Sequence, residues 1–325
     1  MLGILKNHMY LIGIDASDDS LRLAQLGNNG KGISLIAGNS KDRPNDVTPG
    51  SSNWQRWAIE AVRLITAISD FRGKDVIASM PASEVFIDHI RMPKTDESKL
   101  RDAIFSKIKQ KLPFEPLQDN TMMKYLPTEG DNVMVMATER KIIDRHLAIY
   151  EEAGLSIKSI GVWPVALTNC YARFFGRRKS DLKAIVMLIC IETNCTNIVI
   201  CRHKNLLFAR SVSIGAKQLG DEQVLTRLVL ELTACRRQFG SMYRNAQIER
   251  LIFLSGQSVD RDTCAAIAKQ LEIPAQMGDC LAAIEIPNSW KLGKDNEDEK
   301  ENSDTTIDRR NCRVNWAIAF GLSLS

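Results

Sequence analysis

The feature that most constrains the fold is a local pattern that occurs twice: an apolar strand, a short polar turn and a second strand. In the first copy, an apolar strand over residues 10–14 runs into Asp15 and a polar turn, and the next strand starts near Leu21. In the second copy, a strand over residues 184–191 precedes Glu192, and the next strand starts at Thr196. A third strand, a helix and a further apolar strand follow each copy. Two such units in one chain predict an internal duplication with a cleft between the halves.

The first turn has the layout of a phosphate-binding hairpin but not its usual residues. In such a hairpin the strand end holds a carboxylate on the metal side, here Asp15, and the turn amides face the phosphate. The turn needs a glycine so that the backbone can approach the phosphate, and Ser17 stands there instead, followed by Asp18 and Asp19. At about 4 Å and an effective dielectric constant of about 20, each carboxylate would repel a phosphate charge by about 4 kcal/mol. The layout therefore predicts a nucleotide-binding fold, while the residues argue against a working ATPase.

The composition limits the classes of protein to which the chain can belong. With 325 residues, 44% of them hydrophobic and 25% charged, the chain is long enough for two cores of ordinary size. The net charge of +4 does not indicate a nucleic-acid partner, and the longest apolar runs have the length of strands rather than of membrane spans. The eight cysteines form no C-x-x-C pair and do not cluster with the four histidines. These features predict a reduced, cytoplasmic protein without a zinc site, a disulfide framework, a secretory signal or a transmembrane segment.

The middle of the chain predicts a small α+β module inserted into the first half. A strand over residues 80–93 places Val85, Ile87 and His89 on one side, and a helix is expected to start after Thr95. One apolar stripe of this helix recurs every four residues until Pro113 ends the helix. The stripe consists of Leu100, Ile104, Ile108 and Leu112. Two short strands, near residues 124–125 and 133–137, and a helix over residues 138–153 complete the module.

Several segments together resemble the PilM family of type IV pilus and related secretion systems, within the FtsA-like branch of the actin-like ATPase superfamily. The resemblance covers nearly the whole chain, and the order and spacing of the segments are more specific than any one of them. The segments are Gly13-Ile14-Asp15, Leu112-Pro113-Phe114, Glu152-Ala153-Gly154-Leu155, residues 208–215, Glu231 within a helix over residues 223–239, Leu254-Ser255-Gly256 and residues 317–322. The resemblance implies an α/β, actin-like (ribonuclease H-like) duplicated fold with an inserted small α+β subdomain.

The same resemblance suggests how the chain divides. We expect residues 1–80 to form the first actin-like subdomain, together with a return segment over residues 155–175 and a closing helix over residues 313–325. Residues 81–154 would be the inserted module and residues 176–287 the second actin-like half. Residues 288–312 are highly charged and have few apolar side chains, so we expect a disordered loop there.

The resemblance also implies a nucleotide site in the cleft, in a degraded form. The family's second phosphate motif, aligned on Thr196, puts Cys190 where a carboxylate is usual and Glu192 where a glycine is usual. Arg22 replaces a frequent lysine, and Gln257 replaces the second glycine of the adenosine motif. Ten residues would surround ATP with magnesium, and Asp15 is the one on the metal side. They are Asp15, Ser17, Ser20, Arg22, Glu192, Thr193, Thr196, Gly215, Ser255 and Gly256.

The function that the resemblance implies is a non-catalytic scaffold at the cytoplasmic side of the inner membrane. In the PilM family the protein captures the cytoplasmic N-terminal peptide of PilN, a single-span membrane protein, in a groove between the first subdomain and the inserted module. The residues expected to bind this partner are Val85, Ile87, His89, Lys107, Lys111 and Phe114. Two alternatives stay open: an ATP-binding protein or weak ATPase that uses Asp15 to organise magnesium, and an FtsA-like protein that self-associates into polymers at the membrane.

Overall fold

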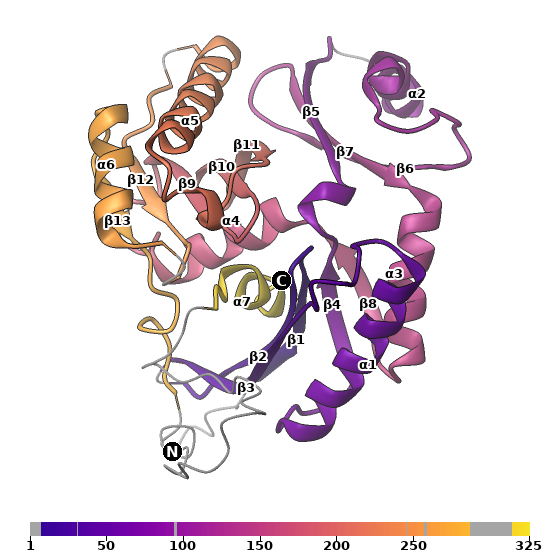
Figure 1. The fold of residues 1–325 in the computed structure, drawn as a ribbon. Coiled ribbons are helices and arrows are strands. Elements are labelled where there is room, and N and C mark those ends of the chain that lie inside the picture. Colours follow the sequence, from indigo (N-terminus) through magenta and orange to yellow (C-terminus); the bar gives the residue numbers. More distant parts are fainter. Residues whose placement is uncertain (1–7, 31, 94–95, 245, 257–258, 287–313) are drawn as a thin grey trace, which may run out of the picture.

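The computed structural model describes residues 8–30, 32–93, 96–244, 246–256, 259–286 and 314–325. Two five-stranded sheets and one three-stranded sheet form its framework (Figure 1). The expected loop over residues 288–312, and Thr95 and Gln257, lie outside the described residues. The α/β fold with two similar halves is confirmed.

The two large sheets have the same strand order and the same strand directions. The first sheet has the order β3-β2-β1-β4-β8 and the second has the order β11-β10-β9-β12-β13. In each sheet an antiparallel hairpin (β1 with β2, β9 with β10) is followed by a parallel neighbour, β4 or β12. The strands of the first sheet are β1 (His8–Ala16), β2 (Ser20–Asn28), β3 (Ile33–Asp42), β4 (Asp75–Ser79) and β8 (Ser156–Gly161). Those of the second are β9 (Ile185–Ile191), β10 (Thr196–Arg202), β11 (Asn205–Val212), β12 (Arg250–Phe253) and β13 (Ala275–Met277).

Helices cover both large sheets and fill the space between them. The helices α1 (Ser52–Ile68) and α3 (Arg140–Glu152) pack on one face of the first sheet, where Trp54, Trp57 and Tyr150 are buried. The helices α4 (Trp163–Phe174) and α7 (Ala317–Ser323) share a core with strands of both sheets. The helices α5 (Glu222–Met242) and α6 (Arg261–Leu271) cover the outer face of the second sheet. Every strand residue from Ile185 to Ile191 is buried, as expected for a strand with helices on both faces.

The inserted module is an antiparallel sheet with one helix on it. Its strands are β5 (Phe86–Arg91), β6 (Thr121–Pro127) and β7 (Asn132–Glu139), in the order β5-β7-β6. The helix α2 (Glu97–Ile108) is shorter than expected, because a 3₁₀ turn over Lys109–Lys111 precedes Pro113. The apolar stripe packs on this sheet, with Ile104 and Ile108 fully buried and Leu100 and Leu112 partly so. In Figure 1 the module stands above the first sheet and opposite the second half.

Candidate functional site

The two polar turns meet in the cleft between the halves, and an arginine joins them. Register places Arg22 on β2 directly opposite Asp15 on β1, so both side chains reach the cleft from the same hairpin. The Arg22 guanidinium donates to Asp15 Oδ2 at 2.9 Å and to Glu192 Oε2 at 2.8 Å. All three side chains are buried, with 7% or less of each exposed. The predicted phosphate pocket therefore holds a carboxylate–guanidinium–carboxylate cluster that spans the two halves.

A residue from the end of the chain completes this cluster. The Asn315 amide, just before α7, donates to Glu192 Oε1 at 2.9 Å and to Cys190 Sγ at 3.1 Å. Sequence reasoning did not find Asn315, because it follows the long charged segment and belongs to no recognisable motif. The cluster thus ties together the first hairpin, the second hairpin and the start of the closing helix.

Burial and the neighbouring charges set the protonation of this cluster. Burial raises the pKa of Asp15 to about 6, while Arg22 lowers it and Glu192 raises it further. Burial alone would lower the pKa of the Arg22 guanidinium, but Glu192 and Asp15 raise it, so Arg22 is charged at every accessible pH. Two carboxylates thus share one permanent cation, and burial moves the pKa of Asp15 toward neutrality.

The other predicted nucleotide residues use their polar groups inside the protein. The Thr196 hydroxyl donates to the Ile214 carbonyl at 2.6 Å, and the Ile191 amide donates to the Ser255 hydroxyl at 2.8 Å. Within the first turn, the Ser17 hydroxyl accepts from the Ser20 amide at 3.1 Å.

The backbone of the second turn is equally occupied. The Thr193 carbonyl accepts from the Lys217 amide. A Cβ at Gly215 would lie 2.5 Å from backbone atoms of Asn194 and Cys195, so the second turn lies directly against the segment that follows β11. Several polar groups of both turns are therefore bonded within the protein.

The acidic pair in the first turn is neutralised in part by its surroundings. The Ser83 hydroxyl donates to Asp18 Oδ1 at 2.7 Å, and Arg43 lies 3.8 Å from Asp19. Burial still raises the pKa of both carboxyls. The repulsion expected from these carboxylates is thus smaller than the sequence suggested, and the filled cleft is the stronger obstacle to a phosphate.

A magnesium ion would have to compete with an ion pair in this cleft. The expected metal-side carboxylate, Asp15, accepts from Arg22 at Oδ2, so a metal ion there would meet a fixed positive charge. Among the described residues no group of three or more histidine, cysteine, aspartate or glutamate side chains could hold a metal ion.

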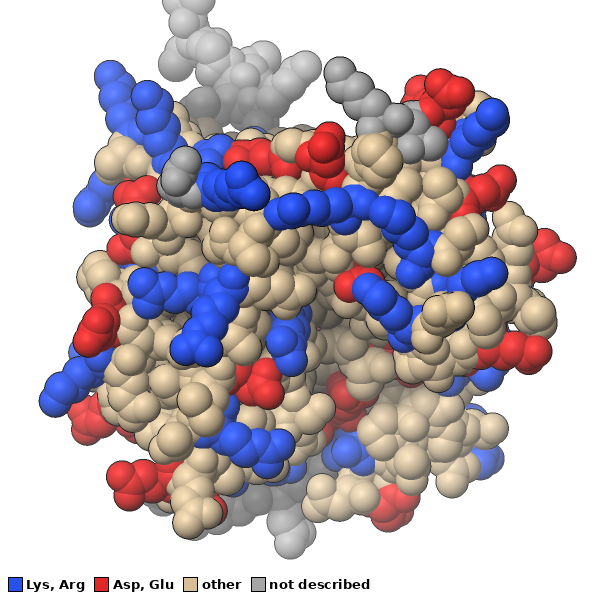
Figure 2. Space-filling view, turned by 90° about the horizontal axis from the view of Figure 1, so that it is seen from above, with Lys and Arg blue, Asp and Glu red and all other residues tan. Residues whose placement is uncertain are grey.

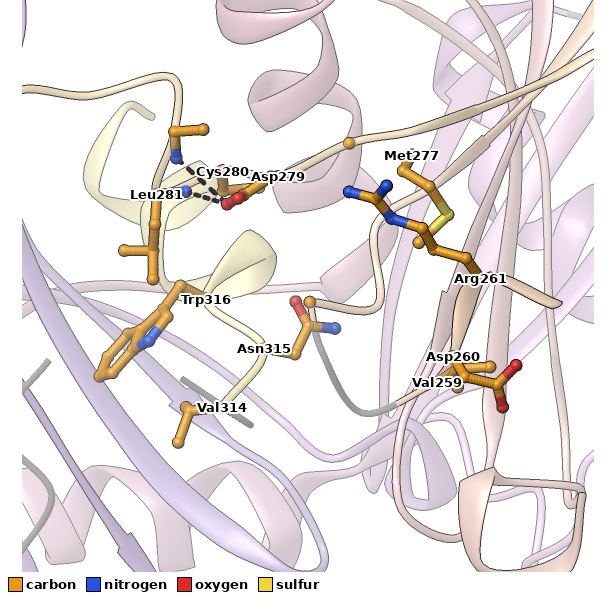
Figure 3. Close-up of a pocket in the computed structure, with 13 residues that line it drawn as sticks. Val259, Asp260, Arg261, Met277, Asp279, Cys280, Leu281, Val314, Asn315 and Trp316 are labelled. Atoms are coloured by element: carbon orange, nitrogen blue, oxygen red, sulfur yellow. Dashed lines mark hydrogen bonds between the residues drawn. The ribbon is translucent and has the colours of Figure 1, made fainter. Parts of the chain in front are cut away.

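One hollow of about 540 Å³ borders the adenosine side of the cleft (Figure 3). Of the ten predicted nucleotide residues, Gly256 lines it, beside Asn315 and Trp316. Its Asp279 carboxylate already accepts from the amides of Leu281 and Ala282, at 2.9 and 3.1 Å. Asn315, which lines this hollow, also bonds to Glu192 at the start of the second turn.

A second kind of site lies where the inserted sheet approaches the first half. A groove of about 330 Å³ separates two edge strands, β6 of the inserted sheet and β8 of the first sheet. We call it the methionine groove. The residues that define it are Met80, Met122, Met123, Met136, Ile143, Leu147, Ile160 and Val162, with Val85, Ala137 and Thr138, and with Arg101 and Lys124 as its charged members. It has an apolar lining and lies beside two edge strands, features that suit an extended peptide.

The residues predicted to bind a partner are divided between two places. Val85 lines the methionine groove, and it also lines a second hollow together with Ile87, His89 and Phe114. Lys107 and Lys111 line neither: Lys107 Nζ donates to the Arg91 carbonyl at 2.6 Å, and Lys111 Nζ lies 2.8 Å from Asp88. Sequence reasoning missed the methionines, because alternating apolar residues in β6 and β7 read equally well as ordinary core.

Two α/β halves of the same topology around a cleft, with a small sheet inserted into the first, define an actin-like protein. The chain belongs to the PilM family, since the family described as "Type IV pilus assembly protein PilM" matches residues 13–233. The comparison with curated proteins gives no match. Within the part of the chain that the structure describes, no helix is both long and apolar enough to cross a membrane.

Solved structures share this fold at low sequence identity. The "PilM-PilN type IV pilus biogenesis complex" matches with a TM-score of 0.73 and 17% identity, over 97% of this chain and 98% of that chain. The cytoplasmic domain of EpsL, an inner membrane component of the type II secretion system of Vibrio cholerae, matches with a TM-score of 0.48 and 11% identity. That match covers 85% of this chain and 88% of the EpsL chain, and its TM-score is too low to carry an argument.

Proposed function

We propose that this protein is a cytoplasmic, non-catalytic scaffold of a type IV pilus or related secretion platform, held at the inner membrane by a PilN-like partner. The methionine groove would take the partner's cytoplasmic N-terminal peptide in an extended form. Membership of the PilM family supports this assignment, as does the similarity to a solved PilM–PilN complex. We further propose the division into domains that the sequence suggests, with the groove between the first subdomain and the inserted module.

The observation that carries the proposal is an apolar floor between two strands that end their sheets, β6 and β8. The amide of Met92, just after β5, and the amide of Thr128, just after β6, both donate to carbonyls at the start of β7. These two bonds fix which residues of β5 and β6 point their amides toward β7. By this alternation the odd-numbered residues of β6 point their amides away from β7, and the Met123 carbonyl on that edge accepts from Arg101 at 3.3 Å. A peptide strand added to β6 would place alternate side chains among the methionines.

Binding of the partner peptide tests this proposal. We expect a labelled synthetic peptide of the first residues of a PilN-like protein to bind the full chain, measured by fluorescence anisotropy. Ile143→Glu puts a charge on the apolar floor and should weaken binding by roughly 30-fold or more, the effect of losing an interface hot spot. Leu230→Glu is the matched control, because Leu230 is 62% exposed on α5, outside the groove. Lys124→Glu changes an exposed side chain at the rim of the groove, so it tests the site without disturbing the core.

Equal binding by wild type, Ile143→Glu and Lys124→Glu would contradict the location of the site. Loss of binding in Leu230→Glu as well would indicate a general loss of folding rather than a groove effect, and circular dichroism distinguishes the two.

The second part of the proposal is that the nucleotide site has lost its function. The buried Arg22 cluster supports this, because ATP would have to displace both ion pairs. We expect millimolar magnesium-ATP to leave the melting temperature unchanged. Ligand at about 100 times its dissociation constant would add roughly 2.7 kcal/mol of stability and a clear upward shift, which would favour the ATP-binding alternative.

A further inference from the structure

The other edge of the inserted sheet faces an edge of the large sheet in the second half. Strand β5 ends the inserted sheet, and β11 ends the second large sheet. Between them lies a hollow of about 600 Å³, within the range of roughly 300–1,000 Å³ usual for binding sites. We call it the edge groove; its central members are Ile87, Asp88, His89, Phe114, Arg210 and Ser211. Figure 2, seen from above, shows the molecule hollowed between these two parts.

The backbone groups along both edges point into this groove. On β5 the Met92 amide, at an even position, bonds toward the β7 side, whereas the His89 amide bonds to the Asp88 side chain instead. The backbone amides and carbonyls of the odd-numbered residues of β5, including Ile87, therefore point away from β7. On β11 the Ala209 amide donates to His89 Nε2 at 3.2 Å, so Ala209 and, by alternation, Ser211 face the groove. The His89 amide, the Arg91 carbonyl and the Ala209 amide already have partners, so the template for an added strand is the backbone of Ile87 and Ser211.

His89 fixes the spacing of the two edges at one end of the groove. Its ring stacks on Phe208 of β11 with the centroids 4.3 Å apart, while its Nε2 accepts the Ala209 amide. Burial lowers the pKa of His89 to about 4, so the ring is neutral at pH 7 and can act as this acceptor. The groove is thus preorganised, which reduces the entropy lost when a peptide binds.

The charged residues that line the edge groove favour a different ligand from the one that suits the methionine groove. Three carboxylates and the guanidinium of Arg210 line it. Glu84 is paired with Arg145 and His146, and Arg210 with Glu231, so Asp88 and Glu139 are the carboxylates that a ligand can use. The lysines paired with Asp88 and Glu139 are 56% and 76% exposed, so these ion pairs are weak and their lysines can be displaced. The methionine groove, in contrast, has Arg101 and Lys124 and no carboxylate.

We propose that the edge groove binds a basic, extended segment of a partner protein as an added strand on β5. The occupant pairs with the outward backbone groups of Ile87 and Ser211 and sets cationic side chains against Asp88 and Glu139. This site is distinct from the methionine groove, although Val85, Ile87, His89 and Phe114, which the sequence assigns to the PilN-like partner, line it. A single inserted sheet then presents each of its edges to a different protein segment.

Two synthetic peptides test this site on the full chain. One is an acetylated, amidated six-residue peptide of alternating lysine and valine, and the other has glutamate in place of lysine. Fluorescence anisotropy should show the lysine peptide binding at least about tenfold more tightly, a difference of roughly 1.4 kcal/mol. Equal affinity of the two peptides would overturn the proposal.

Three variants make the test specific. Ile87→Pro removes an outward amide, which an edge strand tolerates, and should weaken the lysine peptide about tenfold. Asp88→Asn with Glu139→Gln should abolish the preference for lysine, while the matched control, Asp46→Asn with Asp70→Asn, removes two exposed carboxylates elsewhere and should not. If Ile143→Glu abolishes binding of the lysine peptide and Ile87→Pro does not, the peptide occupies the methionine groove and the proposal is wrong.

Discussion

Replacing Gly321 by alanine is expected to destabilise the protein by more than about 4 kcal/mol, enough to prevent folding of an ordinary domain. Gly321 lies in α7 where this helix crosses α4, and a Cβ there would lie far closer than 3.0 Å to the Ala166 carbonyl oxygen. The obstacle is backbone, so no side-chain rotation relieves it. The gain in helix propensity from glycine to alanine, about 1 kcal/mol, is too small to compensate.

Urea unfolding and yield of soluble protein measure this effect. The matched control is Gly240→Ala within α5, where an added Cβ meets nothing within 4 Å. That substitution should raise the free energy of unfolding by about 0.5–1 kcal/mol. If Gly321→Ala unfolds within 1 kcal/mol of the wild type, then α4 and α7 do not pack as closely as the structure has them.

The fold could be predicted from the sequence because its signals are local and repeated. The hairpins around Asp15 and Glu192 appear as apolar strands joined by polar turns, and both sheets are built on them. The position of α7 was harder to derive from residues alone. It depends on Gly13 and Gly321, whose need for close backbone approach becomes visible only when β1, α4 and α7 are placed together.

The sequence named three residues of the cleft cluster, but neither Asn315 nor the ion pairs that join them. Asp15, Arg22 and Glu192 were all expected in the cleft, yet the sequence gives no distance between two residues 170 positions apart. Their joint burial turns three nucleotide residues into an ion cluster, because carboxylates removed from water require a cation. The division of the partner residues between two grooves was also invisible, since it depends on which strands end each sheet.

Replacing Arg22 by methionine is expected to lower the free energy of unfolding by about 3–5 kcal/mol at pH 7.5, since it leaves two buried carboxylates without their cation. The loss should shrink as the pH falls toward about 4. The pKa of Asp15 is already raised to about 6 with Arg22 present, so protonation favours the folded state. The stabilisation from protonated Asp15 is complete below its ordinary pKa of 3.8 and is lost as the pH rises through its pKa in the folded protein. Without Arg22 the folded-state pKa of Asp15 is higher still.

Denaturant unfolding at several pH values checks this expectation, with Lys111→Met as the control. Lys111 also pairs with a carboxylate, that of Asp88, but its side chain is 56% exposed, so its loss should cost less than about 1 kcal/mol at any pH. Adding Asp15→Asn and Glu192→Gln to Arg22→Met should restore most of the stability and remove the pH dependence. A loss that does not change with pH, or that the triple variant does not reverse, would mean that Arg22 stabilises the cleft by packing. The halves would then be held together by α4 and α7 rather than by the ion cluster that fills the nucleotide position.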